Sequence, residues 1–192
     1  GWPTEFMKSK EHLHRLYGIE DLDSFIPWPK ITGGRFTAYT DYIQPGEYSD
    51  DTQLALCTAR SILQDGTCDM VYFSKVELGH WLDYARGAGA SVTAATRAIS
   101  RQRAAWNDNF FRFRAGQGYL DYRNAGANGA AMRIAPIVMA NVTDHARAAT
   151  EILRNAVATH GHPRAVLGAL VYGAALGYVL TDEKKDFANF LS

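Results

Sequence analysis

Apolar residues recur at helical spacing along most of the chain, and this periodicity limits the possible folds more than any other feature. Ala55, Ala59 and Ile62 fall on one face of a helix expected over 51–64. Asp65-Gly66 supplies the stop signal for that helix. The same spacing predicts further helices at 78–85, from Ser91 onward, and over 131–140, 144–159 and 163–180. No segment shows period-2 alternation between hairpin turns, so we expect an all-α fold.

The first 45 residues lack this periodicity. This segment contains five residues of types that interrupt helices or strands: Pro27, Pro29, Gly33, Gly34 and Pro45. One short amphipathic stretch lies at 6–16, and we predict loop for most of the remainder.

The composition is typical of a soluble globular protein with one core. The 192 residues are 47% hydrophobic and 21% charged, and this length suits a single domain over 1–192 better than two. Twenty basic residues balance twenty acidic ones, so the overall charge indicates neither a stable nucleic-acid complex nor a membrane surface. The uncharged run 165–180 contains glycines and is shorter than the ~20 residues of a membrane span, which favours a buried core helix.

Two features predict a cytoplasmic location. Cys57 and Cys68 have neither metal-ligand spacing nor the density of a disulfide framework, so we expect reduced thiols. The N-terminus has no basic segment followed by an apolar one, so no signal peptide is predicted.

A hydroxyl and two adjacent carboxylates stand where a loop enters the helix expected at 51–64. Ser49, Asp50 and Asp51 supply hard oxygen ligands, which suit Mg²⁺ or Mn²⁺ better than a metal that prefers thiolates. The same residue types are also the preferred N-caps and first-turn residues of helices. The motif alone therefore leaves metal binding and helix capping open, with capping favoured.

A second loop of small residues leads into the helix expected at 131–140. It reads Asn124-Ala125-Gly126-Ala127-Asn128-Gly129. Small residues let a ligand approach the backbone, and amides ahead of a helix bind phosphate oxygens, although an ordinary helix start explains the segment alone. Thr159-His160 precedes the last expected helix, where a single histidine is more often structural than a ligand.

Taken in order, these motifs resemble those of the ADP-ribosylglycohydrolase family, which includes the dinitrogenase-reductase-activating glycohydrolases and the ADP-ribosyl-acceptor hydrolases. The family pattern runs from a Gly-Asp-Ala-Leu-Gly stretch with a following Pro and Glu to Thr/Ser-Asp-Asp-Thr, Gly-Asn-Gly-Ala-x-Met-Arg and Thr-His. The matching segments here are 1–5, 49–52, 127–133 and 159–160. The resemblance spans nearly the whole chain and implies a compact orthogonal multi-helix bundle.

This resemblance implies a divalent-metal-dependent hydrolase that cleaves the glycosidic bond between ADP-ribose and a modified target. The target is a protein side chain such as arginine or serine, or a nucleobase. Two Mg²⁺ or Mn²⁺ ions would be held in part by Ser49, Asp50 and Asp51, and either Asp51 or Glu5 would be the catalytic carboxylate. ADP-ribose would contact the following residues: Gly126, Ala127, Asn128, Gly129 and His160.

The chain departs from the family pattern in three places. No Gly-Asp-Thr-Asp-Thr-like motif follows His160, and the chain begins where the first family motif ends. We therefore expect an incomplete domain, with the second half of the metal site outside these residues. Ala127 stands where the binding loop usually has its first glycine. The aromatic partner of adenine has no motif, and Tyr119 and Tyr122 are candidates, with simple packing as the alternative.

Two other functions stay open. A non-catalytic ADP-ribose- or nucleotide-binding pseudoenzyme is favoured by the missing C-terminal aspartates, and a helical scaffold without a ligand would use the acidic motif only for capping. Nothing in the sequence distinguishes among leaving groups, between Mg²⁺ and Mn²⁺, or among oligomeric states.

Overall fold

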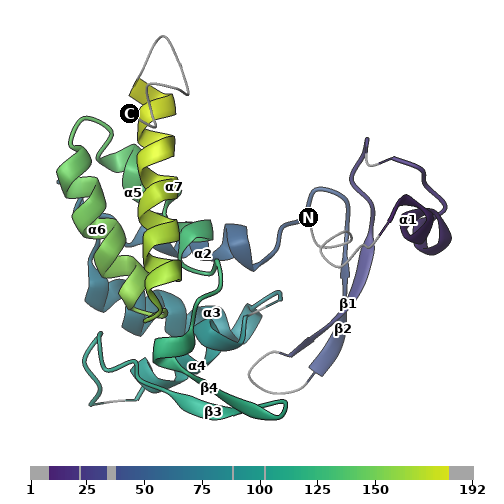
Figure 1. The fold of residues 1–192 in the computed structure, drawn as a ribbon, viewed down its shortest axis with the longest axis horizontal. Helices are drawn as coiled ribbons and strands as arrows, with labels where there is room; N and C mark the ends of the chain where they lie inside the picture. Colours follow the sequence, from purple (N-terminus) through teal and green to yellow (C-terminus); the bar gives the residue numbers. More distant parts are fainter. Residues whose placement is uncertain (1–8, 22, 34–37, 88, 102, 182–192) are drawn as a thin grey trace.

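The computed structural model describes residues 9–21, 23–33, 38–87, 89–101 and 103–181. A body of helices carries a small hairpin, β3–β4, along one end, while α1 and a second hairpin, β1–β2, lie to its side (Figure 1). The elements, in chain order, are α1 (Lys10–Tyr17), β1 (Trp28–Gly33), β2 (Ala38–Ile43), α2 (Asp50–Arg60), the π-helix η2 (Tyr72–Glu77), α3 (Leu78–Tyr84), α4 (Ala90–Ile99), β3 (Arg112–Ala115), β4 (Gly118–Asp121), the 3₁₀ helices η3 (Tyr122–Asn124) and η4 (Ala131–Arg133), α5 (Ala135–Ala140), α6 (His145–Val157) and α7 (Pro163–Thr181).

The helical class is confirmed, and each helix expected from periodicity has a counterpart. The helix expected over 51–64 ends earlier, at Arg60, because the chain turns back there: Ile62 bridges to Cys68 around a turn in which Gly66 has a φ of +85°. The helix expected over 131–140 is divided into η4 and α5, with a proline in the first turn of α5.

The structure also contains two antiparallel hairpins in segments for which the sequence predicted no strands, one of them within the first 45 residues, expected to be mostly loop. β1 pairs with β2 in antiparallel register, from Trp28 opposite Ile43 to Gly33 opposite Ala38. Pro29 and Gly33 obscured this pairing in the sequence, although both strands of a two-stranded sheet are edges, where proline is tolerated. β3 contains most of the stretch Phe111-Arg112-Phe113-Arg114, which does alternate with period 2. A two-residue turn, in which Gly116 has a φ of +59°, connects β3 to β4.

The core consists of two clusters of buried side chains. The first joins α2, η2 and α3 and contains Leu54, Phe73 and Trp81, each fully buried. The second joins η4, α5, α6 and α7 around Ile134 and Ile152. Both cysteines are buried and free, and burial raises the pKa of each thiol to about 11, so they stay protonated as reduced thiols.

Helix α7, expected to be a buried core helix, is buried along one face. Its buried residues are small and one turn apart: Ala165, Ala169, Gly173 and Gly177. A β-carbon at Gly173 would overlap Ile152 of α6, so the glycine lets the two helices approach closely. Among the described helices α7 has the length and hydropathy of a membrane span, a property shared by core helices of soluble proteins.

Candidate functional site

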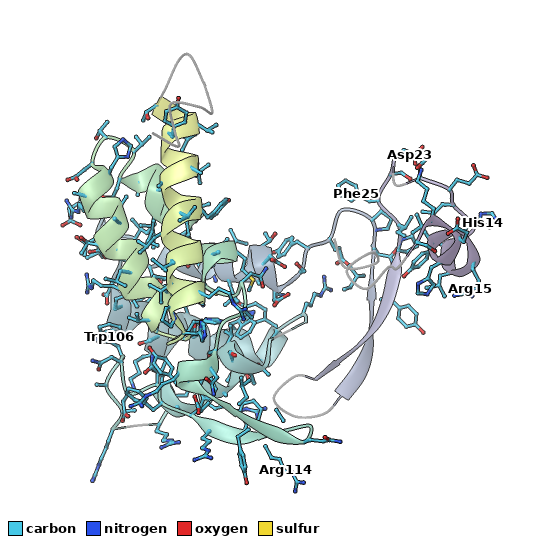
Figure 2. The ribbon with its side chains drawn as sticks, in the orientation of Figure 1. His14, Arg15, Asp23, Phe25, Trp106 and Arg114 are labelled. Atoms are coloured by element: carbon cyan, nitrogen blue, oxygen red, sulfur yellow. The ribbon has the colours of Figure 1, made fainter. Side chains whose placement is uncertain are left out.

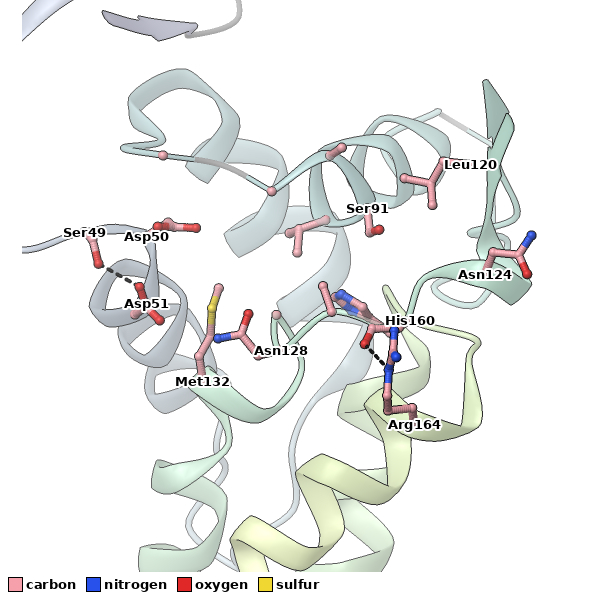
Figure 3. A pocket seen from close by; sticks show the side chains of 17 residues that line it. Ser49, Asp50, Asp51, Ser91, Leu120, Asn124, Asn128, Met132, His160 and Arg164 are labelled. Atoms are coloured by element: carbon pink, nitrogen blue, oxygen red, sulfur yellow. Dashed lines mark hydrogen bonds between the residues drawn. The ribbon is translucent and has the colours of Figure 1, made fainter. Parts of the chain in front are cut away.

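A cavity of about 650 Å³ opens between the starts of α2 and α4, the loop 124–129 and the connection from α6 to α7 (Figure 3). Eight of the nine predicted site residues line it: Ser49, Asp50, Asp51, Gly126, Ala127, Asn128, Gly129 and His160. The ninth, Glu5, lies outside the described residues. Segments more than 100 residues apart in sequence thus meet at one cavity, while the individual roles of these residues stay predictions.

One wall of the cavity is acidic and belongs to the start of α2. Ser49 occupies the N-cap position, but its side chain accepts no hydrogen bond from the helix amides. Its Oγ instead donates to Oδ2 of Asp51 at 2.8 Å, and Asp50 lies beside them with 7% of its surface exposed. Helix capping therefore does not explain the orientation of the Ser49 side chain. Three side chains with oxygen atoms lie together on this wall.

The position of this wall is fixed by Gln53, one turn further along α2. Its Oε1 accepts hydrogen bonds from Trp81 Nε1 at 3.1 Å and from the Arg86 amide at 3.0 Å. Its Nε2 donates to the Tyr84 carbonyl, and the Asp50 amide donates to the Arg86 carbonyl at 2.9 Å. These bonds tie the first turn of α2 to the end of α3.

The opposite wall is the small-residue loop, which packs tightly at Gly129. A β-carbon there would lie 2.8 Å from Cε1 of His160 and 3.1 Å from Cγ2 of Val92. At Gly126 a β-carbon would lie 2.9 Å from Nη2 of Arg164, whose Nε donates to the Gly126 carbonyl at 3.1 Å. Glycine at these two positions thus lets the loop lie against the residues behind it.

His160 contributes a neutral ring to the cavity wall. It is 1% exposed, and burial, assisted by the positive charge of Arg133, lowers its pKa to about 3. Its Nδ1 shares a hydrogen bond of 2.8 Å with the Thr159 hydroxyl, which fixes the ring orientation. At neutral pH the imidazole can therefore serve as a hydrogen-bonding group but not as a cation.

The cavity is electrically polarised. Asp50 and Asp51 lie at one end, Arg164 lies at the other, and Asn128 is between them (Figure 3). A ligand that presents hydroxyl groups to one end and an anionic group to the other would match this arrangement.

The model of the family described as ADP-ribosylglycohydrolase matches residues 1–192. The chain belongs to this family. It is 28% identical over 181 residues to the ADP-ribosyl-[dinitrogen reductase] glycohydrolase of Rhodospirillum rubrum, an alignment that covers 94% of this chain and 53% of that protein. It is 27% identical over 164 residues to the ADP-ribosylarginine hydrolase Tri1 of Serratia proteamaculans (strain 568), covering 82% and 41%. The chain thus spans about half the length of these relatives.

Sequence reasoning missed several residues that line the cavity of this ADP-ribosylglycohydrolase family member. Arg164 stands just after the Thr-His motif, and Leu120 and Asn124 come from β4 and η3. The entry to α4 also lines it with Gly87, Gly89, Ala90 and Ser91. That segment is a run of small residues leading into a helix, the same signal that identified the loop at 124–129.

Arg133, the last residue of the family motif, lies behind the loop and not in the cavity. It is fully buried, and its Nη1 donates to the Gly129 carbonyl at 3.1 Å. Its Nε and Nη2 donate to Oδ1 and to the carbonyl of Asn155 at 2.8 and 2.7 Å, and its guanidinium lies over the ring of Phe73. Burial lowers the pKa of Arg133 to about 10, so it stays charged at neutral pH. It connects the loop to α6.

Neither tyrosine proposed for adenine stacking lines the cavity. The Tyr122 hydroxyl donates to the Val157 carbonyl at 2.6 Å, and its ring packs edge-on against Phe110. Tyr119 is 62% exposed on β4, beneath the guanidinium of Arg112. These contacts with described residues give Tyr122 a structural role in packing.

The oxygen atoms of the acidic wall could coordinate a divalent ion from one side of that ion only. Ser49, Asp50 and Asp51 offer a hydroxyl and two carboxylates, which are ligands that Mg²⁺ and Mn²⁺ accept. No group of three or more His, Cys, Asp or Glu side chains able to hold a metal occurs among the described residues. Further ligands would have to come from outside those residues.

Proposed function

We propose that this chain forms the ADP-ribose-binding part of a hydrolase that releases ADP-ribose from a modified protein side chain, with ADP-ribosylarginine as the first candidate substrate. One observation carries the proposal: the acidic motif, the small-residue loop and His160 of the Thr-His motif line a single cavity. The names of the two relatives, an ADP-ribosylarginine hydrolase and an ADP-ribosyl-[dinitrogen reductase] glycohydrolase, support this substrate class.

The cavity has a suitable size and polarity for this ligand. Its volume of about 650 Å³ lies within the roughly 300–1,000 Å³ of small-molecule sites. The diphosphate would lie along the loop at 126–129 toward Arg164, where small residues expose the backbone and a guanidinium supplies positive charge. The ribose that carries the scissile bond would then face Asp50 and Asp51.

The reaction is hydrolysis at the anomeric carbon of that ribose. Water adds its oxygen to the carbon while the bond to the side-chain nitrogen breaks, through a transition state with oxocarbenium character. A carboxylate, either Asp51 or Glu5, accepts the proton of the water, and the departing nitrogen gains a proton. The hydrogen bond from Ser49 orients the Asp51 carboxylate for this role.

Ser49, Asp50 and Asp51 would hold Mg²⁺ or Mn²⁺, with two ions expected and the remaining ligands outside these residues. The ions would supply positive charge that orients the ribose hydroxyls and polarises water. Substrate binding at the other end of the cavity would depend on this chain's own loop and His160.

The test is release of ADP-ribose by the purified protein from an ADP-ribosylarginine peptide, followed by chromatography with Mg²⁺, with Mn²⁺ and with chelator. We expect metal-dependent release that is lost in Asp51→Asn, whereas Asp23→Asn, an exposed aspartate away from the cavity (Figure 2), leaves it unchanged. ADP-ribose binding without release under any metal would support the pseudoenzyme instead. Absence of both binding and release would refute the proposal.

A further inference from the structure

Positive charge is concentrated in one segment of a chain whose overall charge is zero. Residues 97–123 contain six arginines and two aspartates, a net charge of +4, and no lysine. The chain as a whole has equal numbers of basic and acidic residues, so the remaining residues together carry −4. The arginines are Arg97, Arg101, Arg103, Arg112, Arg114 and Arg123.

These arginines are available to a partner. All six are exposed, and none forms an ion pair with a described residue. Among the described residues, the guanidinium of Arg112 lies 4.6 Å from the ring centroid of Tyr119. Six exposed arginines against two aspartates leave a net positive charge that the segment does not neutralise itself, which favours a contact with negative charge.

The hairpin β3–β4 has two faces with different roles. Side chains alternate along a strand, so Arg112 and Arg114 share one face. On that face Tyr119 lies opposite Arg114 and Asp121 lies opposite Arg112, so the face keeps a net positive charge. Leu120, opposite Phe113, belongs to the other face and lines the cavity. The hairpin therefore borders the cavity with one face and presents arginine and tyrosine outward with the other. Arg114 extends from the end of the molecule (Figure 2).

The composition of this surface favours a protein partner. Arginine, tyrosine and phenylalanine are enriched at protein interfaces and lysine is depleted there, whereas nucleic-acid surfaces use both arginine and lysine. The outer face combines arginines with Tyr119, 62% exposed, and the neighbouring Phe110 is 64% exposed. Arg112 stacked on Tyr119 forms a planar arrangement suited to carboxylates.

We infer that the outer face of β3–β4 docks an acidic surface of the ADP-ribosylated protein while the modified side chain enters the adjoining cavity. This inference rests on the proposed function and adds a second contact to it, away from ADP-ribose itself. Recognition would depend on the residues around the modified side chain as well as on the modification.

The test compares two peptides that carry one ADP-ribosylated arginine, flanked by glutamates in one and by glutamines in the other. Binding to the purified protein is measured by fluorescence anisotropy at about 0.1 M salt, where charges interact over about 10 Å, and at about 1 M, where they interact over about 3 Å. We expect the glutamate peptide to bind roughly fivefold more tightly at low salt, and the preference to vanish at high salt.

Two matched charge reversals locate the effect. Arg114→Glu should abolish the preference for the glutamate peptide and leave the affinity for free ADP-ribose unchanged. Arg15→Glu, on α1 and far from the hairpin (Figure 2), should change neither. Equal losses for both peptides and for free ADP-ribose in Arg114→Glu would overturn the inference, as would an equal preference in wild type and Arg114→Glu.

Two other results separate this inference from its alternatives. Tighter binding of a DNA duplex than of the glutamate peptide, lost in Arg114→Glu, would assign the surface to nucleic acid and overturn the inference. A wild-type protein that binds the unmodified glutamate peptide but not ADP-ribose would refute the proposed function while leaving the acidic-partner surface supported.

Discussion

Arg133 carries a buried positive charge, and among the described residues no carboxylate forms an ion pair with it. Three hydrogen bonds, to Gly129 and to two atoms of Asn155, take that place. A buried cation that is solvated only by carbonyl groups depends on every one of those bonds. The shape of the loop at 126–129 therefore depends on a residue that does not line the cavity.

Arg133→Lys should be costly although it keeps the charge. A lysine ammonium cannot reach the three acceptors in the planar arrangement of a guanidinium, so buried oxygen atoms lose their partners. We expect the free energy of unfolding in urea to fall by about 2–3 kcal/mol. The exposed Arg123→Lys is the control and should stay within about 0.5 kcal/mol. A stable Arg133→Lys protein with wild-type ADP-ribose affinity would contradict the positioning role.

His160 should make the protein sensitive to acid. Its pKa is about 3 in the folded protein, below the roughly 6.5 of an unfolded chain. Between these values the unfolded chain binds a proton that the folded protein does not, so stability is fully present above about pH 6.5 and falls as the pH decreases toward 3. The expected loss between pH 7 and pH 5 is about 2 kcal/mol.

The measurement is urea unfolding of wild type and His160→Gln at the two pH values. The variant should lose less stability than wild type on acidification, because its side chain does not titrate. His14→Gln, an exposed position on α1, should reproduce the wild-type difference. If His160→Gln keeps the full pH dependence, other groups cause it.

At the scale of elements, local patterns predicted the helices well and the hairpins poorly. The apolar spacing of α2, α4, α6 and α7 is contained in each segment, so the sequence alone was sufficient. β1 and β2 depend on pairing between two segments, one of which contains Pro29. The Phe-Arg alternation of β3 was visible in the sequence but overlooked beside the glycine-rich stretch that follows it.

In the candidate site, too, local motifs could be predicted from the sequence, whereas residues brought together by packing could not. The motifs at 49–51, 126–129 and 159–160 were found because each is a recognisable local sequence. Arg164 and Ser91 were missed because a single arginine or serine becomes a cavity residue only when separate elements pack together. The sequence places Asp50 and Asp51 at a helix start. Only the structure shows that the Ser49 side chain accepts no capping hydrogen bond from the helix amides.

Because α6 packs against one face of α7, alanine substitutions at two glycines of α7 should change the stability in opposite directions. Gly173→Ala would push its methyl group into Ile152, which is 2% exposed and cannot move without disturbing Ile134 and Val138. We expect a loss of about 1–3 kcal/mol in the free energy of unfolding. Gly168→Ala faces open space and should add about 0.5–1 kcal/mol through helix propensity. Losses of similar size in both variants would show that the contact with Ile152 is not what makes Gly173 sensitive.

At the scale of the whole molecule, the cavity connects elements from both core clusters. Its walls come from α2 and α4, from the loop before η4 and from the start of α7. Because a ligand in it would contact all of these at once, binding should stabilise the folded helical body as a unit.

ADP-ribose should therefore raise the thermal midpoint of the purified protein. At a free concentration of about 100 times Kd the gain is about 2.7 kcal/mol. For a chain of this size each kcal/mol shifts the midpoint by about 2–4 °C, which predicts a rise of about 5–10 °C. ADP at the same concentration should give a smaller rise, because it keeps the diphosphate but lacks the second ribose that would face Asp50 and Asp51. Equal rises with ADP and ADP-ribose would mean that the acidic wall does not engage that ribose, and the assignment of Ser49, Asp50 and Asp51 to the reacting end of the ligand would then fail.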